Sequence, residues 1–152
     1  MVYLCWTYRR KVMGTNVYMK RIPTESELNE IKARIDNRRF DDAIEFINQV
    51  RKEVHIGKRS CGWQFLFAPN PDYYEENWDS INNFLHEPGW ELINEYGDHL
   101  TPAEFKEEYV NDFADGYDSE SHHEAYPDEP YYPGWEHKSI DGLRFASTAD
   151  FA

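Results

Sequence analysis

The chain has few cysteines, no long apolar stretch and, in its second half, almost no basic residues. Its two cysteines, Cys5 and Cys61, are too few for a disulfide framework, and we expect reduced thiols in the core. No run approaches the roughly 20 apolar residues of a membrane span, and residues 1–10 do not follow the pattern of a signal peptide. These absences predict a cytoplasmic protein without a membrane segment.

Basic residues are scarce only after residue 63. Residues 1–63 contain 13 Lys and Arg against 8 Asp and Glu, whereas residues 64–152 contain 3 against 21, which gives +5, −18 and a total of −13. The acidic half is also rich in Tyr and Trp, unlike a disordered acidic tail. We therefore expect an ordered surface that presents negative charge and attracts basic partners.

The length of 152 residues suits one domain, and an aromatic content of 16% supplies material for its core. Composition divides the chain into four parts. These are a basic half at 1–63, an acidic core part at 64–113, an acidic Tyr-rich loop at 114–133, and a C-terminal strand and tail at 134–152.

The basic half is predicted to hold strands and a helical hairpin. Segments 2–8 and 17–22 have the composition of strands. Thr24 and Glu27 form a capping box that starts a helix. Apolar residues at helical spacing then predict a second helix over about 41–53, packed antiparallel on the first.

Strands and helices are predicted to alternate in the middle of the chain. Strands are expected at 54–57 and 62–68 around a basic turn at 58–60. Asn70 and Pro71 should open a third helix. A strand at 90–94 should end at a turn over 96–98.

A second capping box, Thr101 with Glu104, predicts a fourth helix that carries Phe105, Tyr109 and Phe113. The segment 114–133 shows neither helical nor strand period, so we expect a long loop there. A final strand is predicted at 140–145. The fold class is α+β, a single domain with a small, mainly antiparallel sheet and about four helices on one face.

No motif in the sequence predicts catalysis, a cofactor or a metal. The stretch around Lys58 lacks the glycine and hydroxyl spacing of a phosphate-binding loop. His122 and His123 are adjacent rather than spaced as zinc ligands. Cys61, near Arg59, is better explained by packing than by nucleophilic chemistry. We therefore predict a protein that is not an enzyme.

The acidic half offers the strongest functional signal. Glu104, Glu108 and Asp112 are spaced at i, i+4 and i+8, about 6 Å apart per step along one face of a helix. That step is close to the spacing of phosphates along one nucleic-acid strand. An ordinary solvated surface is the alternative. The candidate partner-binding residues are Glu104, Glu107, Glu108, Asp112, Asp115, Asp118, Glu120, Glu124, Tyr126, Asp128, Glu129, Tyr131 and Tyr132.

The basic turn is a second candidate site. Two cations and a hydroxyl within one turn can bind a phosphate or a carboxylate. A solvated hairpin tip, with Trp63 in the core, explains the same residues. The candidate ligand-binding residues are His55, Lys58, Arg59, Ser60, Trp63, Glu95 and Tyr96.

Two segments carry a resemblance. Residues 55–65 are His-Ile-Gly-Lys-Arg-Ser-Cys-Gly-Trp-Gln-Phe, and residues 94–97 are Asn-Glu-Tyr-Gly. Together with Trp78, they resemble a family of short bacteriophage-encoded proteins of uncharacterised function. In that family a His-Ile-Gly-Lys-Ser turn precedes a Gly-Trp-x-Phe strand. The resemblance spans about residues 54–105, with Arg59 in place of Ser and Asn94 in place of Asp. It implies a phage origin, no particular reaction, and site residues at His55, Lys58, Ser60, Trp63, Glu95, Tyr96 and Gly97.

The sequence thus predicts a non-enzymatic phage or mobile-element protein of the host cytoplasm. Its acidic half should bind a basic, nucleic-acid-binding host protein, as an anti-CRISPR or other anti-defence inhibitor that mimics nucleic acid, and should not bind nucleic acid itself. The alternative is a sponge or enzyme for a small phosphorylated nucleotide at the turn between His55 and Trp63. A third possibility is a virion component that packs through its Tyr-rich loop.

Overall fold

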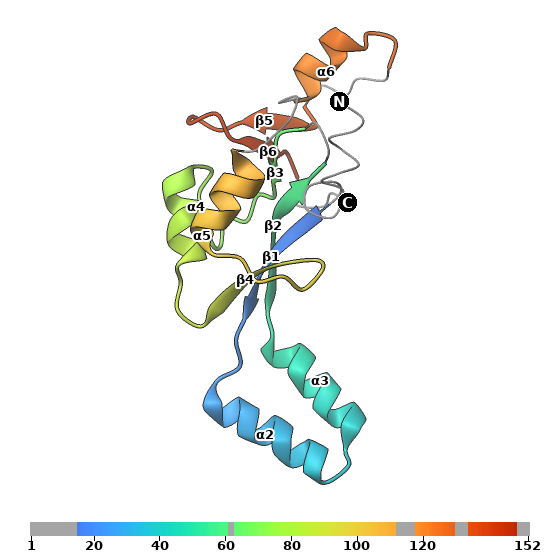
Figure 1. Cartoon of the computed structure of the whole chain (residues 1–152), viewed down its shortest axis with the longest axis vertical. Helices are drawn as coiled ribbons and strands as arrows, with labels where there is room; N and C mark the ends of the chain where they lie inside the picture. Colours follow the sequence, from blue (N-terminus) through green and yellow to red (C-terminus); the bar gives the residue numbers. More distant parts are fainter. Residues whose placement is uncertain (1–14, 61–62, 112–117, 130–133, 149–152) are drawn as a thin grey trace.

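The computed structural model describes residues 15–60, 63–111, 118–129 and 134–148 (Figure 1). Within these ranges six strands form one sheet in the order β4-β1-β2-β3-β6-β5. All neighbours are antiparallel except β3 and β6, which are parallel. The strands are β1 (Thr15–Arg21), β2 (Glu53–Arg59), β3 (Leu66–Phe67), β4 (Trp90–Asn94), β5 (Glu136–Lys138) and β6 (Arg144–Ala146). The predicted α+β class with a mostly antiparallel sheet is confirmed.

Helices α4 (Trp78–Leu85) and α5 (Pro102–Phe105) cover one face of the sheet, and the core lies beneath them (Figure 1). Alternation along β1 buries Val17 and Met19 on this face. Phe105 of α5 is fully buried and meets the ring of Phe65 edge to face, with centroids 5.1 Å apart. Phe67 stacks on Phe145 at 5.3 Å, which ties β3 to β6.

Helices α2 (Glu25–Asp36) and α3 (Phe40–Val50) connect β1 to β2 as an antiparallel hairpin that projects beyond the sheet (Figure 1). The capping box at Thr24 is present: its hydroxyl accepts the amide of Glu27, whose carboxylate accepts the amide of Thr24. Two arginines hold the base of the hairpin. Arg21 donates to the carbonyl of Val50 at 2.7 Å, and Arg51 donates to the carbonyl of Arg21 at 3.1 Å.

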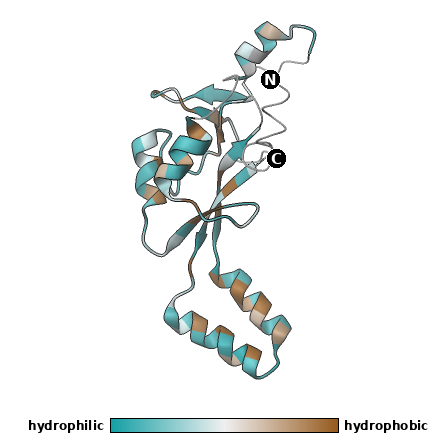
Figure 2. Cartoon of the chain, viewed as in Figure 1, coloured by the Kyte–Doolittle hydropathy of each residue, from teal (hydrophilic) through white to brown (hydrophobic). Residues whose placement is uncertain are grey.

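The second predicted helix ends earlier than expected, at Val50, because Glu53 already pairs with Lys20 in the sheet. Hydropathy along the hairpin is mixed, with apolar segments on both helices (Figure 2). None of the helices in the described ranges is long and apolar enough to span a membrane.

The predicted basic turn at 58–60 is wrong. Lys58 and Arg59 belong to β2, where they pair with Asn16 and Thr15 of β1. Arg59 is only 2% exposed, because it donates to the backbone carbonyl of Tyr109 in the adjoining helix. The following strand, β3, is shorter than expected, since it comprises Leu66 and Phe67.

The start of the third helix is also corrected. Asn70 does not cap a helix: residues 71–73 form only a turn, and the Nδ2 of Asn70 donates to the carbonyl of His55 and to the hydroxyl of Tyr74. The cap is Asn77, whose side chain accepts the amide of Ser80, and α4 begins at Trp78. Pro88 and Gly89 follow its end, and β4 has the predicted bounds, Trp90–Asn94.

The segment 114–133 is not entirely irregular. Helix α6 (Ser119–Ala125) forms within it, and Asp118 accepts the amide of Ser121 at its start. The final strand is shorter than predicted, and β5 was missed. Residues 139–143 turn between β5 and β6, and Ile140 is fully exposed there. The predicted strand at 2–8 lies outside the described residues.

Candidate functional site

Exposed carboxylates gather on the helical layer that covers the sheet. Residues 69–111 contain eleven Asp and Glu and a single Lys. Among the described residues only Glu76 and Glu91 of these eleven form ion pairs, with His137 and with Arg51 and His99, so nine carboxylates stay unpaired. Five of the nine lie on or beside α4, α5 and the turn that follows α5. We call these five the acidic layer: Glu75, Asp79, Glu104, Glu107 and Glu108.

The helices that carry the acidic layer are fixed to one another. The rings of Trp78 and Phe105 stack with centroids 6.3 Å apart. The ammonium of Lys106 lies 4.3 Å from the centroid of Trp78. All five carboxylates of the layer are exposed. The layer is therefore an ordered, negatively charged surface.

Half of the described cations of the basic half form ion pairs with other described residues, five of the ten Lys and Arg in residues 15–60. The ion pairs are Lys20–Glu53, Arg21–Glu27, Arg34–Glu30, Arg39–Asp42 and Arg51–Glu91. Four of these pairs use carboxylates of the same half, and only Arg51 is paired with a carboxylate of the acidic half. Negative charge dominates what the described fold presents to a partner.

The regular ladder expected on the fourth helix is not present. Thr101 caps α5 by accepting the amide of Glu104 at 3.1 Å, but among the described residues the return bond of the predicted capping box does not form. After Phe105 the chain continues as a π-helical turn, η1 (Lys106–Val110). A π turn holds more residues than an α turn, so Glu104 and Glu108 are not one α-helical turn apart. Asp112 lies outside the described residues.

The other predicted partner-binding residues, from Asp115 to Tyr132, differ in their exposure. Asp118 is half-buried and serves the structure, because it caps α6 and pairs with Lys138 at 2.9 Å. Burial opposes its ionisation, but the Ser121 amide and Lys138 outweigh burial and lower the pKa of Asp118 to about 2. Exposed members on α6 and just after it are Glu120, Glu124, Tyr126, Asp128 and Glu129. Asp115, Tyr131 and Tyr132 lie outside the described residues.

Two parts of the candidate ligand site come together around Asn16 of β1. His55 of β2 lies 3.0 Å from the side-chain oxygen of Asn16, and Glu95 accepts the Asn16 amide at 2.8 Å. Burial lowers the pKa of His55. Glu95 and Tyr96 are exposed after β4. The structure therefore brings His55 and Glu95 together through Asn16 of β1.

The cationic part of that site is not open. Arg59 is buried, and Lys58 and Ser60 are half-buried. Burial, followed by the nearby Arg144 cation, lowers the pKa of Lys58. Trp63 is half-buried with the guanidinium of Arg144 4.9 Å from its ring centroid. Lys58 and Arg59 therefore belong to β2 and not to an exposed basic turn.

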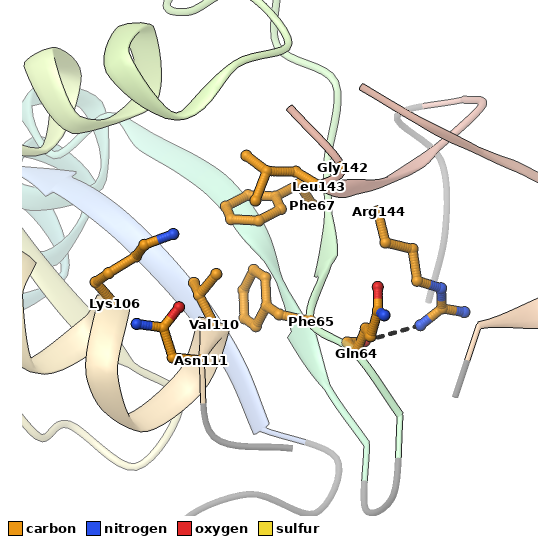
Figure 3. Close-up of a pocket in the computed structure, with 9 residues that line it drawn as sticks. All are labelled: Gln64, Phe65, Phe67, Lys106, Val110, Asn111, Gly142, Leu143 and Arg144. Carbon is orange, nitrogen blue, oxygen red and sulfur yellow. Dashed lines mark hydrogen bonds between the residues drawn. The ribbon is translucent and has the colours of Figure 1, made fainter. Parts of the chain in front are cut away.

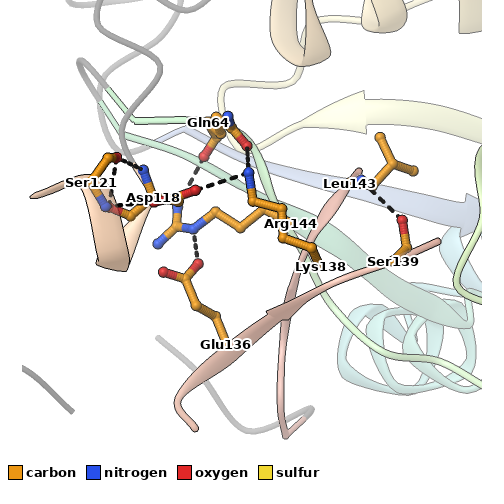
Figure 4. A network of polar contacts seen from close by, with 8 residues as sticks. All are labelled: Gln64, Asp118, Ser121, Glu136, Lys138, Ser139, Leu143 and Arg144. Atoms are coloured by element: carbon orange, nitrogen blue, oxygen red, sulfur yellow. Dashed lines mark hydrogen bonds and ion pairs between the residues drawn. The ribbon is translucent and has the colours of Figure 1, made fainter. Parts of the chain in front are cut away.

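Arg144 and Glu136 are the charged residues that sequence reasoning missed (Figure 4). Their side chains are each 9% exposed and form an ion pair, and Arg144 also donates to the carbonyl of Gln64 at 2.9 Å. Lys138 extends the network to the side-chain oxygen of Gln64 and to Asp118. An arginine between Leu143 and Phe145 in an acidic half was a usable signal, since a buried cation needs an anionic partner.

A cavity of about 170 Å³ lies between β3, η1 and the β5–β6 turn (Figure 3). Phe65, Phe67 and Val110 meet the polar ends of Asn111 and Gln64 there, with Lys106, Gly142, Leu143 and Arg144 completing the wall. Sites for drug-sized ligands measure roughly 300–1,000 Å³. The cavity is therefore too small to enclose a nucleotide.

Among the described residues no three His, Cys, Asp or Glu side chains are grouped so that they could hold a metal ion. Comparison with known proteins gives no relative: no protein-family model matches the chain, and neither a curated protein nor a solved structure is similar to it.

Proposed function

We propose that this chain is a non-enzymatic protein of phage or mobile-element origin that binds a basic, nucleic-acid-binding protein of the bacterial host. The observation that carries the proposal is the acidic layer, whose five exposed carboxylates have no cationic partner among the described residues. An anti-CRISPR or another inhibitor of host defence is the concrete form, because such host complexes use basic clefts to hold nucleic acid.

The physical basis is competition for one cationic surface. A cleft that binds nucleic acid is lined by Lys and Arg that contact phosphates. Unpaired carboxylates on rigid helices can occupy the same cations without first losing an ion pair of their own. Long-range attraction also raises the association rate, and salt weakens it.

The test combines competition with charge reversal. Purified CRISPR effector complexes are assayed for target-DNA binding by mobility shift, with and without this protein. We expect the protein to displace DNA and excess DNA to displace the protein. The triple variant Glu104→Lys, Glu107→Lys and Glu108→Lys should slow association at least about tenfold at low salt.

A matched control keeps the change in net charge the same. Asp36, Asp41 and Glu45 are exposed on the hairpin and form no ion pair with any residue in the described ranges. Their reversal to Lys should leave association much closer to wild type. Equal loss in the two triple variants would show that only net charge matters. Inhibition that is indifferent to both variants and to salt would refute the proposed surface.

A further inference from the structure

The cavity between β3, η1 and the β5–β6 turn differs in charge from the acidic half around it. Residues 64–152 contain three Lys and Arg, which are Lys106, Lys138 and Arg144. Two of the three, Lys106 and Arg144, line this cavity, and none of the described residues in its wall is an Asp or Glu (Figure 3). In a half-chain with 21 Asp and Glu, the cavity therefore presents a cationic wall to an anion.

The charge of Arg144 is already used within the fold. Its guanidinium pairs with Glu136, donates to the carbonyl of Gln64 at 2.9 Å and lies 4.9 Å from the ring centroid of Trp63. Lys106 is different, because its ammonium forms no ion pair or hydrogen bond with any residue that the structure describes. Lys106 is therefore the cation that the cavity can offer to a ligand.

The surroundings of Lys106 leave room for an anionic partner. Its ammonium lies 4.3 Å from the ring centroid of Trp78. The nearby carboxylate of Asp141 accepts the Trp78 amide at 2.7 Å and the Ser139 hydroxyl. Burial lowers the pKa of Lys106, and the charge of Asp141 opposes this shift. An anion beside a partly desolvated ammonium is attracted more strongly than it is in bulk water.

The π turn η1 places a second donor beside Lys106. The backbone amide of Asn111 donates to the carbonyl of Lys106 at 2.8 Å, which is the i to i+5 bond of a π-helix. In an α-helix two residues five apart lie about 140° apart around the axis, and the π turn brings them nearer to one side. Figure 3 shows both side chains on the η1 side of the cavity. The side chain of Asn111 is exposed, and its Nδ2 has no acceptor among the described residues.

The volume of the cavity limits the size of a ligand. It measures about 170 Å³, and a cavity of about 150 Å³ is known to hold benzene, with its six carbons. The space therefore suits about six or seven non-hydrogen atoms. The half-buried side chain of Leu143 offers an apolar contact in the wall.

The donors of the cavity also limit the charge of a ligand. One unpaired ammonium and one free amide match a carboxylate, which carries a single negative charge and accepts through two oxygens. A phosphate carries close to two negative charges, for which the described wall holds too few unpaired cations.

We propose that the cavity between β3, η1 and the β5–β6 turn binds a small free monocarboxylate, held by the ammonium of Lys106 and the side-chain amide of Asn111. The inference is independent of the proposed function, since neither residue belongs to the acidic layer. It assigns a ligand to the lysine that the described fold leaves without an ion pair.

Butyrate tests the site, because it has six non-hydrogen atoms and one charge, and butyramide is its uncharged analogue. Each is titrated into the full chain at pH 7 and constant ionic strength, and binding is followed in ¹H–¹⁵N NMR spectra. We expect butyrate to bind with a dissociation constant of about 1 mM and to shift amide signals of η1 and the β5–β6 turn. Butyramide should bind at least about tenfold more weakly, since hydrogen bonds to charged groups are the stronger ones.

Two variants test the donors. Lys106→Met should weaken butyrate binding at least about tenfold and remove the preference for butyrate over butyramide. Asn111→Asp keeps the shape of the side chain but adds a like charge, so it should also weaken butyrate. Lys52→Met is the matched control for Lys106→Met and should bind as wild type does. Lys52 is exposed, it forms no ion pair with a described residue, and its loss changes the net charge equally. Far-UV circular dichroism and thermal unfolding check that each variant is folded.

Several results would overturn the proposal. Wild type that does not bind butyrate at about 50 mM, or that binds butyramide equally well, would do so without any variant. A folded Lys106→Met chain that binds butyrate as wild type does would have the same consequence. Inorganic phosphate that binds more tightly than butyrate would overturn the carboxylate class. Tighter binding of the amidated peptide Gly-Gly-Glu-Gly-Gly would overturn the assignment to a free acid, because the same carboxylate would then come from a peptide chain.

Discussion

Gly57 is the position where one added methyl group should do the most damage to this fold. It lies in β2 opposite Phe67 of β3, next to the irregularity in the pairing of β2 with β1. A Cβ there would lie 2.2 Å from the carbonyl oxygen of Leu66 and 2.5 Å from Cε1 of Phe65. The first collision is with backbone, so no side-chain rotation relieves it.

The size of the destabilisation depends on which parts of the fold must move to relieve the collision. Relief requires β3 to shift away from β2 and the Phe65 ring to leave its place against Phe105. Overpacking of this kind costs about 1–3 kcal/mol and occasionally more, and we expect the upper end, about 3 kcal/mol. For a chain of this size that lowers the melting temperature by roughly 6–12 °C.

Gly97→Ala is the matched control for Gly57→Ala. Gly97 has φ of +87°, and nothing lies within 4 Å of an added Cβ. The left-handed backbone alone should cost about 1–2 kcal/mol. Thermal unfolding followed by circular dichroism compares the two variants at one protein concentration. If Gly57→Ala is no more destabilising than Gly97→Ala, the close approach of β2 and β3 is not as tight as this reasoning requires.

Two further predictions concern buried charge and pH. Arg144→Met should destabilise the fold by about 3–5 kcal/mol in urea unfolding, because it removes one partner of a buried ion pair. Adding Glu136→Leu should recover much of the loss, and a double variant as unstable as the single one would argue against this explanation. Burial lowers the pKa of His55, so the unfolded chain binds its proton more readily. Stability should therefore decline as pH falls below about 6.5, and His55→Gln should decline less steeply over pH 7 to 5 than wild type does.

Local signals in the sequence were sufficient for several elements. Thr24 and Glu27 satisfy each other's amides within four residues, so the start of α2 needed no information from elsewhere. The Thr101 hydroxyl likewise caps α5 by a local bond from the Glu104 amide, and β4 is bounded by Pro88-Gly89 before it and the turn at Gly97 after it. Capping and turn chemistry act over a few bonds, which is why these boundaries were predictable.

Other elements depended on distant contacts. Asn70 has the properties of a helix cap, but its Nδ2 donates to the carbonyl of His55 in β2 and only a turn follows it, and Asn77 caps α4 instead. A charged residue such as Arg59 is expected in an exposed turn, but it is buried because its guanidinium donates to the backbone carbonyl of Tyr109. In both cases a contact with a residue distant in sequence, which forms only in the folded chain, determined the local structure.

For the acidic layer, too, some properties follow from the sequence alone and others only from the fold. The sequence determined how many carboxylates the second half carries, and therefore the sign of its field. Tertiary structure decided which of them are free, because ion pairs join residues far apart, as in Arg51 with Glu91 and Lys138 with Asp118. An ion pair depends on a distance of a few ångströms between side chains, and that distance is a property of the packed fold.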